Sequence, residues 1–303
     1  MTGWILFKRK SETTPGWGSY AVNRLMDVAP SRNISLKVIS PDNFDLIITR
    51  EKKTTWINQQ VEKIPDFVIT RVGSGASYFS LAIIRHLERL GVHTFNCSKG
   101  IDIVRDKLYA QQVLVQSNLP VPKTILVKFP VNIDLVERYL GFPVIVKTVF
   151  GSKGAGVFLS EDRRSFVDLM QLLEATKPNV NIILQETITT SLGKDLRVFV
   201  VGGKIIGCMQ RTSKTDSFKA NFSAGADVEA YPINSEIEWL ARQSARTLSL
   251  DIAGIDLLFD GEHFKICEVN ASPGFNGLEQ ANPGLNVPNE IFDYISLRLG
   301  EFD

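Results

Sequence analysis

A lysine followed by a run of glycines forms the most informative segment of the chain. An apolar run ends at Lys147, and Gly151, Gly154 and Gly156 follow before the next apolar run. Glycines let backbone N–H groups gather around an anion, and a lysine at a strand end adds a positive charge. The segment therefore predicts a loop that holds nucleotide phosphates, with an ordinary tight turn as the alternative. It lacks the GxxxxGK[ST] pattern and does not lead into a helix, which excludes a Walker A loop and a dinucleotide fingerprint.

Three oxygen-bearing side chains occur close together near the other end of the chain. Asp256 lies in one apolar run, and Glu268 and Asn270 lie two residues apart in the next, so these two share a strand face. A hairpin over Asp260-Gly261 would bring Asp256 beside them. Two carboxylates and an amide oxygen suit Mg²⁺, which prefers oxygen ligands. The alternative is a hairpin with polar ends in solvent, although a carboxylate within an apolar run is costly unless it is paired.

Several other residues could carry chemistry but have ordinary alternatives. Lys107, after Asp106 at the start of an expected helix, could approach phosphates or be a surface lysine behind a helix cap. Arg71 follows a strand and could hold a carboxylate with its planar guanidinium. Tyr78 replaces the last glycine of a dinucleotide fingerprint here. Cys267 lies within a strand, where an inert buried thiol is the usual finding. The histidines lack partners at catalytic or ligand spacing: His86, His93 and His263.

The elements that must position these residues change in type along the chain. Up to about residue 98, short apolar runs alternate with helical patterns, which is typical of an open α/β sheet, and a domain border is expected there. A small α+β unit follows, and the chain is rich in strands from Ile182 onward. Leu46–Thr49 is expected as a strand, Lys52–Lys63 as a solvated helix or loop, and Thr212–Ala226 as a functional loop.

Composition limits the classes of function. The chain has 303 residues, 44% of them hydrophobic, and a net charge of +1, which favours a packed protein without a bulk attraction to nucleic acid or membrane surfaces. Three widely spaced cysteines argue against a disulfide framework or a zinc site. No apolar run approaches the roughly 20 residues of a membrane span, and the short first run precedes its basic residues, the reverse of a secretory signal. We expect a cytoplasmic protein and leave self-association open.

Taken in order, these segments resemble the ATP-grasp superfamily and, within it, the RimK-like carboxylate–amine ligases. The resemblance is densest over residues 99–285, and residues 66–98 are similar to the N-terminal domain of RimK-type proteins. Two positions depart from the pattern: Thr187 replaces a usual aromatic residue and Lys219 a usual arginine. The matching segments are Arg105-Asp-Lys107, the lysine and glycine segment, Gln185-Glu186, Asp195-Leu-Arg197, Arg211, Asn221, Asp256 and Glu268-Val-Asn270-Ala-Ser-Pro-Gly274.

The resemblance implies an α/β protein with an ATP-grasp fold built from α+β subdomains. Residues 1–98 would form an N-terminal open α/β pre-ATP-grasp domain. Residues 99–184 would form the central subdomain with a glycine-loop lid. Residues 185–303 would form the C-terminal subdomain with the metal site.

The resemblance also implies roles for individual residues. ATP would bind to Lys107, Lys147, Gly151, Ser152, Gly154, Gly156, Gln185, Glu186, Thr187 and Asp195. Arg211 and Asn221 would act with Lys147 at the phosphates, and Asp256, Glu268 and Asn270 would hold two Mg²⁺ or Mn²⁺ ions. Arg71 and Arg197 are our candidates for holding substrate carboxylates.

The implied activity is an ATP- and Mg²⁺-dependent ligase. A substrate carboxylate would attack the γ-phosphate of ATP, and an amine would then capture the acylphosphate to give an amide. We expect glutamate or another amino acid to be added to a peptide or protein C-terminus. The alternatives are a ligase of small-molecule amino-acid or natural-product biosynthesis, and a non-catalytic ATP-binding regulatory module. The complete set of metal-binding side chains argues against the module.

Overall fold

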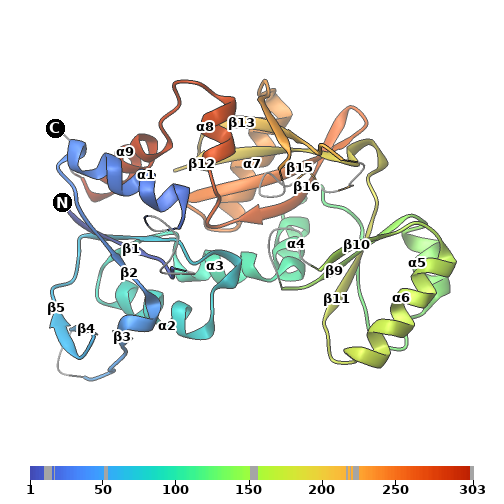
Figure 1. The fold of residues 1–303 in the computed structure, drawn as a ribbon, viewed down its shortest axis with the longest axis horizontal. Coiled ribbons are helices and arrows are strands. Elements are labelled where there is room, and N and C mark those ends of the chain that lie inside the picture. The colour runs from blue at the N-terminus through green and yellow to red at the C-terminus, as the bar shows by residue number, and fades with distance from the viewer. Residues whose placement is uncertain are drawn as a thin grey trace.

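The chain folds around three main sheets that meet near its middle. The computed structural model describes residues 1–9, 16, 18–50, 54–150, 156–215, 218, 220 and 225–300. Figure 1 shows the N-terminal strands and α2 below the C-terminal sheet, α1 beside α9, and the central elements to one side, with helix α4 between the groups. The mixed α/β architecture confirms the expected fold class.

The N-terminal sheet is parallel, as its alternating pattern predicts. Its four strands lie in the order β2-β1-β6-β7. The strands are β1 (Thr2–Leu6), β2 (Ser35–Ile39), β6 (Phe67–Thr70) and β7 (His93–Phe95), and the helices between them are α1 (Tyr20–Val28) and α2 (Tyr78–Arg89). The strand order reverses between β1 and β6, and in open α/β sheets ligands bind beyond the carboxyl ends of the strands at such a point. Arg71 directly follows β6 there.

Two expectations for residues 46–63 are wrong. Leu46–Thr49 forms no strand, and the polar segment contains a hairpin rather than a helix or loop. Strand β3 (Phe44–Asp45) pairs with β4 (Thr55–Ile57), which pairs with β5 (Gln60–Glu62). Thr55 and Ile57 are buried while their neighbour is half-buried, so this alternation outweighs the charged composition of the segment.

Two helices lead from the N-terminal sheet to the central one. They are α3 (Ser98–Arg105) and α4 (Lys107–Gln116). Asp106 caps α4, because its carboxylate accepts hydrogen bonds from the backbone N–H groups of Leu108 (2.9 Å) and Tyr109 (3.0 Å). This cap fixes Lys107 at the first position of the helix.

The central sheet is antiparallel, with helices on one face. Its order is β10-β9-β11-β8. The strands are β8 (Thr124–Leu126), β9 (Val144–Thr148), β10 (Val157–Ser160) and β11 (Ile182–Glu186), and the helices are α5 (Ile133–Tyr139) and α6 (Arg163–Thr176). Val144 and Val146 pack toward the helices, so Lys147 lies on the opposite face.

The C-terminal sheet is antiparallel, with the order β14-β13-β12-β15-β16. Its strands are β12 (Lys194–Val201), β13 (Lys204–Thr212), β14 (Asp227–Ala230), β15 (Ile252–Asp260) and β16 (His263–Asn270). The helices are α7 (Ser235–Thr247), α8 (Asn276–Ala281) and α9 (Val287–Leu299), and short 3-10 helices occupy Ala29–Arg32, Pro41–Asn43, Gly73–Gly75 and Thr189–Ser191. The expected hairpin over Asp260-Gly261 is confirmed, with Asp256 directly opposite Glu268.

The hydrophobic cores show which elements pack together. Residues from alternate positions of β1 enter two cores, each of which also contains residues of the C-terminal sheet. The third core, centred on Phe166 and Met170, is built from the central elements alone. The central elements are thus the part of the protein least fixed by apolar packing to the rest. Among the helices of the described ranges, none is both long and apolar enough to cross a membrane.

Candidate active site

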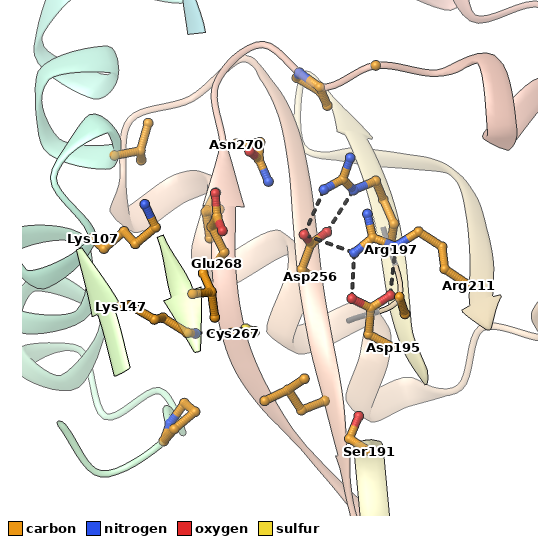
Figure 2. A pocket seen from close by; sticks show the side chains of 18 of the residues that line it. Lys107, Lys147, Ser191, Asp195, Arg197, Arg211, Asp256, Cys267, Glu268 and Asn270 are labelled. Carbon is orange, nitrogen blue, oxygen red and sulfur yellow. Dashed lines mark hydrogen bonds and ion pairs between the residues drawn. The ribbon is translucent and has the colours of Figure 1, made fainter. Parts of the chain in front are cut away.

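One pocket collects most of the side chains that the sequence singles out. Its volume is about 540 Å³, and all three groups of elements contribute to its walls. Figure 2 shows Lys107 and Lys147 on one side of Glu268, and three charged side chains beyond Asp256 on the other. The predicted site residues that line this pocket are Arg71, Lys107, Lys147, Gln185, Glu186, Thr187, Asp195, Arg197, Arg211, Asp256, Glu268 and Asn270.

Two arginines and two aspartates form a continuous ion-pair network in this pocket. Arg211 stands opposite Asp195 in the β12–β13 register and donates to its two oxygens at 2.7 and 2.6 Å. Arg197 stands opposite Asp256 in the β12–β15 register and donates to its two oxygens at 2.7 and 2.6 Å. A further contact of 3.1 Å joins Arg211 to Asp256. Both arginines are thus held by bidentate geometry, which fixes the direction of each guanidinium.

Burial and charge act against each other in this network. Burial alone would raise the pKa of Asp256, but the guanidiniums of Arg197 and Arg211 hold it below its ordinary value. For Asp195, burial outweighs the attraction of Arg211 and raises the pKa. Arg211 is only 3% exposed, and although burial opposes its charge, Asp256 and Asp195 raise its pKa. Arg211 therefore keeps its positive charge inside the pocket.

The two predicted phosphate-binding lysines approach from the central elements. Lys147, near the end of β9, donates a hydrogen bond to the sulfur of Cys267 at 3.7 Å. Lys107 comes from the first turn of α4, where burial lowers its pKa and the charge of Glu268 opposes that shift. Both ammonium groups thus lie on the same side of Glu268 and bring positive charge into the pocket.

The side chains of Glu268 and Asn270 provide a test for a metal. The ends of the Asn270 amide lie 3.3 Å from Glu268 Oε1 and 3.2 Å from Arg197 Nη2. In the orientation that satisfies its hydrogen bonds, the Asn270 amide nitrogen donates to Glu268 and the amide oxygen accepts from Arg197. A carboxylate and an amide on neighbouring positions of one strand face supply the oxygen ligands that Mg²⁺ prefers. Together with Asp256, this donor set fits Mg²⁺, which uses few protein ligands beside phosphate and water.

Asp256 is the most heavily engaged member of that set, because three guanidinium contacts already surround its carboxylate. Among the described residues, no group of three or more His, Cys, Asp and Glu side chains is arranged to hold a metal. Glu268, which forms no ion pair among the described residues, would therefore be the carboxylate most available to a metal, and Asp256 would share its oxygens between a metal and the arginines.

The part of the pocket next to β11 is lined by three predicted ATP-binding residues: Gln185, Glu186 and Thr187. The carboxylate of Glu186 accepts hydrogen bonds from Lys265 Nζ (2.8 Å) and the backbone N–H of Lys123 (2.9 Å). The carboxylate of Glu186 is thus held by other groups of the protein. Gln185 is buried and bonded to Thr124. The Thr187 hydroxyl is buried and has no hydrogen-bond partner among the described residues.

Arg71 reaches the pocket from the carboxyl end of β6. Burial lowers the pKa of its guanidinium to about 10, so the group stays charged at neutral pH. No carboxylate of the described residues forms an ion pair with it. It therefore differs from Arg197 and Arg211, whose charges are already compensated.

Some predicted residues lie outside the described residues: Gly151, Ser152, Gly154 and Asn221. Gly156 is described, with a φ of +72° and a position where a Cβ would lie 2.7 Å from the Thr148 hydroxyl. The sequence did not single out Lys194 or assign a site role to Cys267, yet both line the pocket. The β15–β16 register shifts at Asp256, so Cys267 is the extra residue of a bulge. No sequence signal indicated that bulge.

Family models and named relatives both connect this chain with RimK-like ATP-grasp proteins. The model of the RimK-like ATP-grasp domain matches residues 104–295, and that of the RimK pre-ATP-grasp domain matches residues 15–101. A probable α-L-glutamate ligase of Rhodopirellula baltica is 32% identical over 281 residues, covering 92% of this chain and 69% of the relative. A probable α-L-glutamate ligase 1 of Shewanella denitrificans is 33% identical over 279 residues, covering 91% of this chain and 93% of the relative.

Solved structures share the fold at lower identity. A RimK domain ATP-grasp protein from Sphaerobacter thermophilus superposes with a TM-score of 0.73 at 16% identity, covering 97% of this chain and 99% of that one. The D-alanine–D-alanine ligase of Bacillus anthracis, solved with ATP, superposes with a TM-score of 0.67 at 15% identity, covering 99% of each chain.

Proposed function

The chain belongs to the RimK-like ATP-grasp family, and from that premise we propose that it joins a substrate carboxylate to the amine of an amino acid, with glutamate as the amine substrate. Its family consists of C–N ligases that use ATP and Mg²⁺. The proposed acceptor is the carboxylate of a peptide or protein C-terminus. The proposed reaction passes through an acylphosphate, which the amine then converts into an amide.

The observation that carries this proposal is the convergence of two kinds of groups in one pocket. Lys107 and Lys147 supply positive charge on one side of Glu268, Arg211 lies on the other side beyond Asp256, and Arg71 supplies a guanidinium from the side of the N-terminal sheet. A nucleotide and a carboxylate could thus be held in the same cavity. Phosphoryl transfer requires positioning and charge neutralisation rather than a protein nucleophile, and the pocket offers these.

Arg71 is the proposed receptor of the substrate carboxylate. Its charge at neutral pH and its lack of a described ion-pair partner leave the planar guanidinium available for two parallel hydrogen bonds. Arg197 is the second candidate, but its two donors already bind Asp256. A carboxylate at Arg197 would have to share that guanidinium, so Arg71 is the stronger candidate.

Asp256, Glu268 and Asn270 are proposed to hold two Mg²⁺ ions. When bound there, Mg²⁺ would neutralise phosphate charge and polarise the γ-phosphoryl group. Arg211, held between Asp195 and Asp256, is proposed to stabilise the charge that develops on the transferred group. Glu268 and Asn270 orient each other across 3.3 Å. The roles of Gly151, Ser152, Gly154 and Asn221 stay predictions.

The proposal is tested by incubating the protein with Mg²⁺-ATP, a pool of amino acids and peptides with free or amidated C-termini. We expect ADP release that needs a free carboxylate, and a product whose mass has increased by one glutamate residue. EDTA should stop the reaction and Mn²⁺ should restore it. ADP release that is equal with amidated peptides would contradict the proposed acceptor, and nucleotide binding without turnover across the pool would favour the regulatory module.

A further inference from the structure

A single buried amide joins the N-terminal sheet to the strands that carry the proposed metal ligands. Asn96 directly follows β7 and is completely buried. Its Nδ2 donates to the backbone carbonyl oxygens of Ile252 (2.6 Å) and Ala271 (2.7 Å), and its Oδ1 accepts from the backbone N–H of Ile252 (2.8 Å). These contacts use both donor directions of the amide group and fix its orientation.

The backbone atoms that Asn96 contacts lie at the open end of the β15–β16 hairpin, which carries the proposed metal ligands. Ile252 begins β15, which carries Asp256, and Ala271 directly follows Asn270 at the end of β16. The last pair of the β15–β16 register at this end is Gly254 with Asn270. The amide of Asn96 therefore bridges the strands just where their own pairing stops.

The other end of this connection is fixed to the strand before Arg71. The Thr70 hydroxyl accepts from the backbone N–H of Asn96 at 2.7 Å and donates to the Asn96 carbonyl oxygen at 3.0 Å. Thr70 is the last residue of β6, and Arg71, the proposed carboxylate receptor, follows it directly. The hydrogen bonds of Thr70 and Asn96 therefore connect the strand that ends before Arg71 with the backbone next to Asn270. A hydrophobic residue could fill the space at position 96 but could not satisfy three buried backbone groups.

We propose that Asn96 is a positioning residue: it holds the open end of the β15–β16 hairpin so that Asn270 and Asp256 keep the spacing that metal binding needs. The inference rests on the proposed function, because it assumes those side chains bind Mg²⁺. Residues outside the ligand set that orient it commonly change metal affinity by about 10- to 100-fold when they are removed. A purely structural role would reduce stability without that selective loss.

The test compares Asn96→Ala with a matched control, Asn282→Ala. The amide of Asn282 also donates to two backbone carbonyls, those of Leu278 (3.0 Å) and Cys208 (3.5 Å), but neither belongs to the hairpin. Binding of Mn²⁺ in the presence of ADP is measured by electron paramagnetic resonance. Metal-free ADP binding is measured in EDTA, and each protein is tested below its own unfolding temperature.

Asn96→Ala is expected to weaken Mn²⁺ binding by about tenfold or more, with metal-free ADP affinity changed by no more than about twofold. Asn282→Ala should leave both affinities near wild type. An Asn96→Ala protein with wild-type Mn²⁺ affinity, or an equal loss in Asn282→Ala, would overturn the proposal. Because this measurement needs no amide product, it stays decisive even if the substrate proposal fails.

If Asn96→Ala does not fold, Thr70→Val provides the second test. Valine preserves the shape of Thr70 but removes the hydroxyl that anchors the Asn96 backbone. We expect weaker Mn²⁺ binding with unchanged metal-free ADP binding. Wild-type Mn²⁺ affinity in this variant would overturn the proposal.

Discussion

The two carboxylates that stand opposite each other in the β15–β16 hairpin should respond differently to loss of charge. Asp256 receives three contacts from Arg197 and Arg211. Glu268 forms no ion pair within the described part of the chain. We therefore expect Glu268→Gln to impair catalysis alone, whereas Asp256→Asn should impair both catalysis and stability.

The magnitudes follow from burial and pairing. Removing one partner of a buried ion pair costs about 3–5 kcal/mol, and since Arg197 retains 16% exposure, the lower value of about 3 kcal/mol applies to Asp256→Asn. At about 2–4 °C per kcal/mol, its Tm should fall by roughly 6–12 °C. Glu268→Gln should change stability by less than about 1 kcal/mol. Loss of metal-based charge neutralisation worth about 4 kcal/mol should lower its kcat about 1,000-fold.

Thermal unfolding and ADP release, measured on the same preparations, test this contrast. Arg242→Ala is a suitable control because its ion pair with Glu238 lies on an exposed helix face, and it should change neither quantity appreciably. The reasoning would be refuted by a Glu268→Gln protein that turns over normally. It would also be refuted if Asp256→Asn were as stable as wild type.

Three further perturbations test other parts of the account. Arg71→Lys should raise KM for the carboxylate substrate about tenfold and leave KM for ATP unchanged, because lysine lacks the planar fork; a change in ATP affinity alone would contradict this role. Asp66→Ala should destabilise the protein by about 1 kcal/mol at neutral pH. Hydrogen bonds from Thr2 hold the pKa of Asp66 below 3.8, so this stabilisation is present above that value and is lost as the pH falls through the lower pKa of the folded state; thermal unfolding of both proteins should converge in acid. Gly3→Ala should cost about 1–3 kcal/mol in denaturant unfolding, since its Cβ would lie 2.3 Å from the buried Phe67 ring; unchanged stability would show that the ring can move aside.

The proximity of the proposed metal ligands could be predicted because it depends on local patterns. Glu268 and Asn270 share a strand face through their spacing, and a short turn brings Asp256 opposite Glu268. The pairing of Arg211 with Asp195 and of Arg197 with Asp256 could not be predicted. It depends on the order and register of strands that are far apart in the sequence.

Two features could not be predicted from local composition, because they depend on burial and on strand pairing. The charged segment before Lys63 folds as a hairpin because Thr55 and Ile57 alternate into the core. Asn58 and Gln59 form its turn with positive φ values of 50° and 63°. Likewise, the bulge that brings Cys267 to the pocket wall is a property of the paired strands. Neither feature is visible in hydrophobic periodicity alone.

The most direct test of the central claim follows an oxygen atom. With a carboxylate substrate identified by product mass, its oxygens are isotopically labelled, and the phosphate released with Mg²⁺-ATP and glutamate is analysed by mass spectrometry. Formation of an acylphosphate requires one labelled oxygen to appear in phosphate for each amide formed. Amide formation with unlabelled phosphate would contradict activation of the carboxylate by phosphoryl transfer.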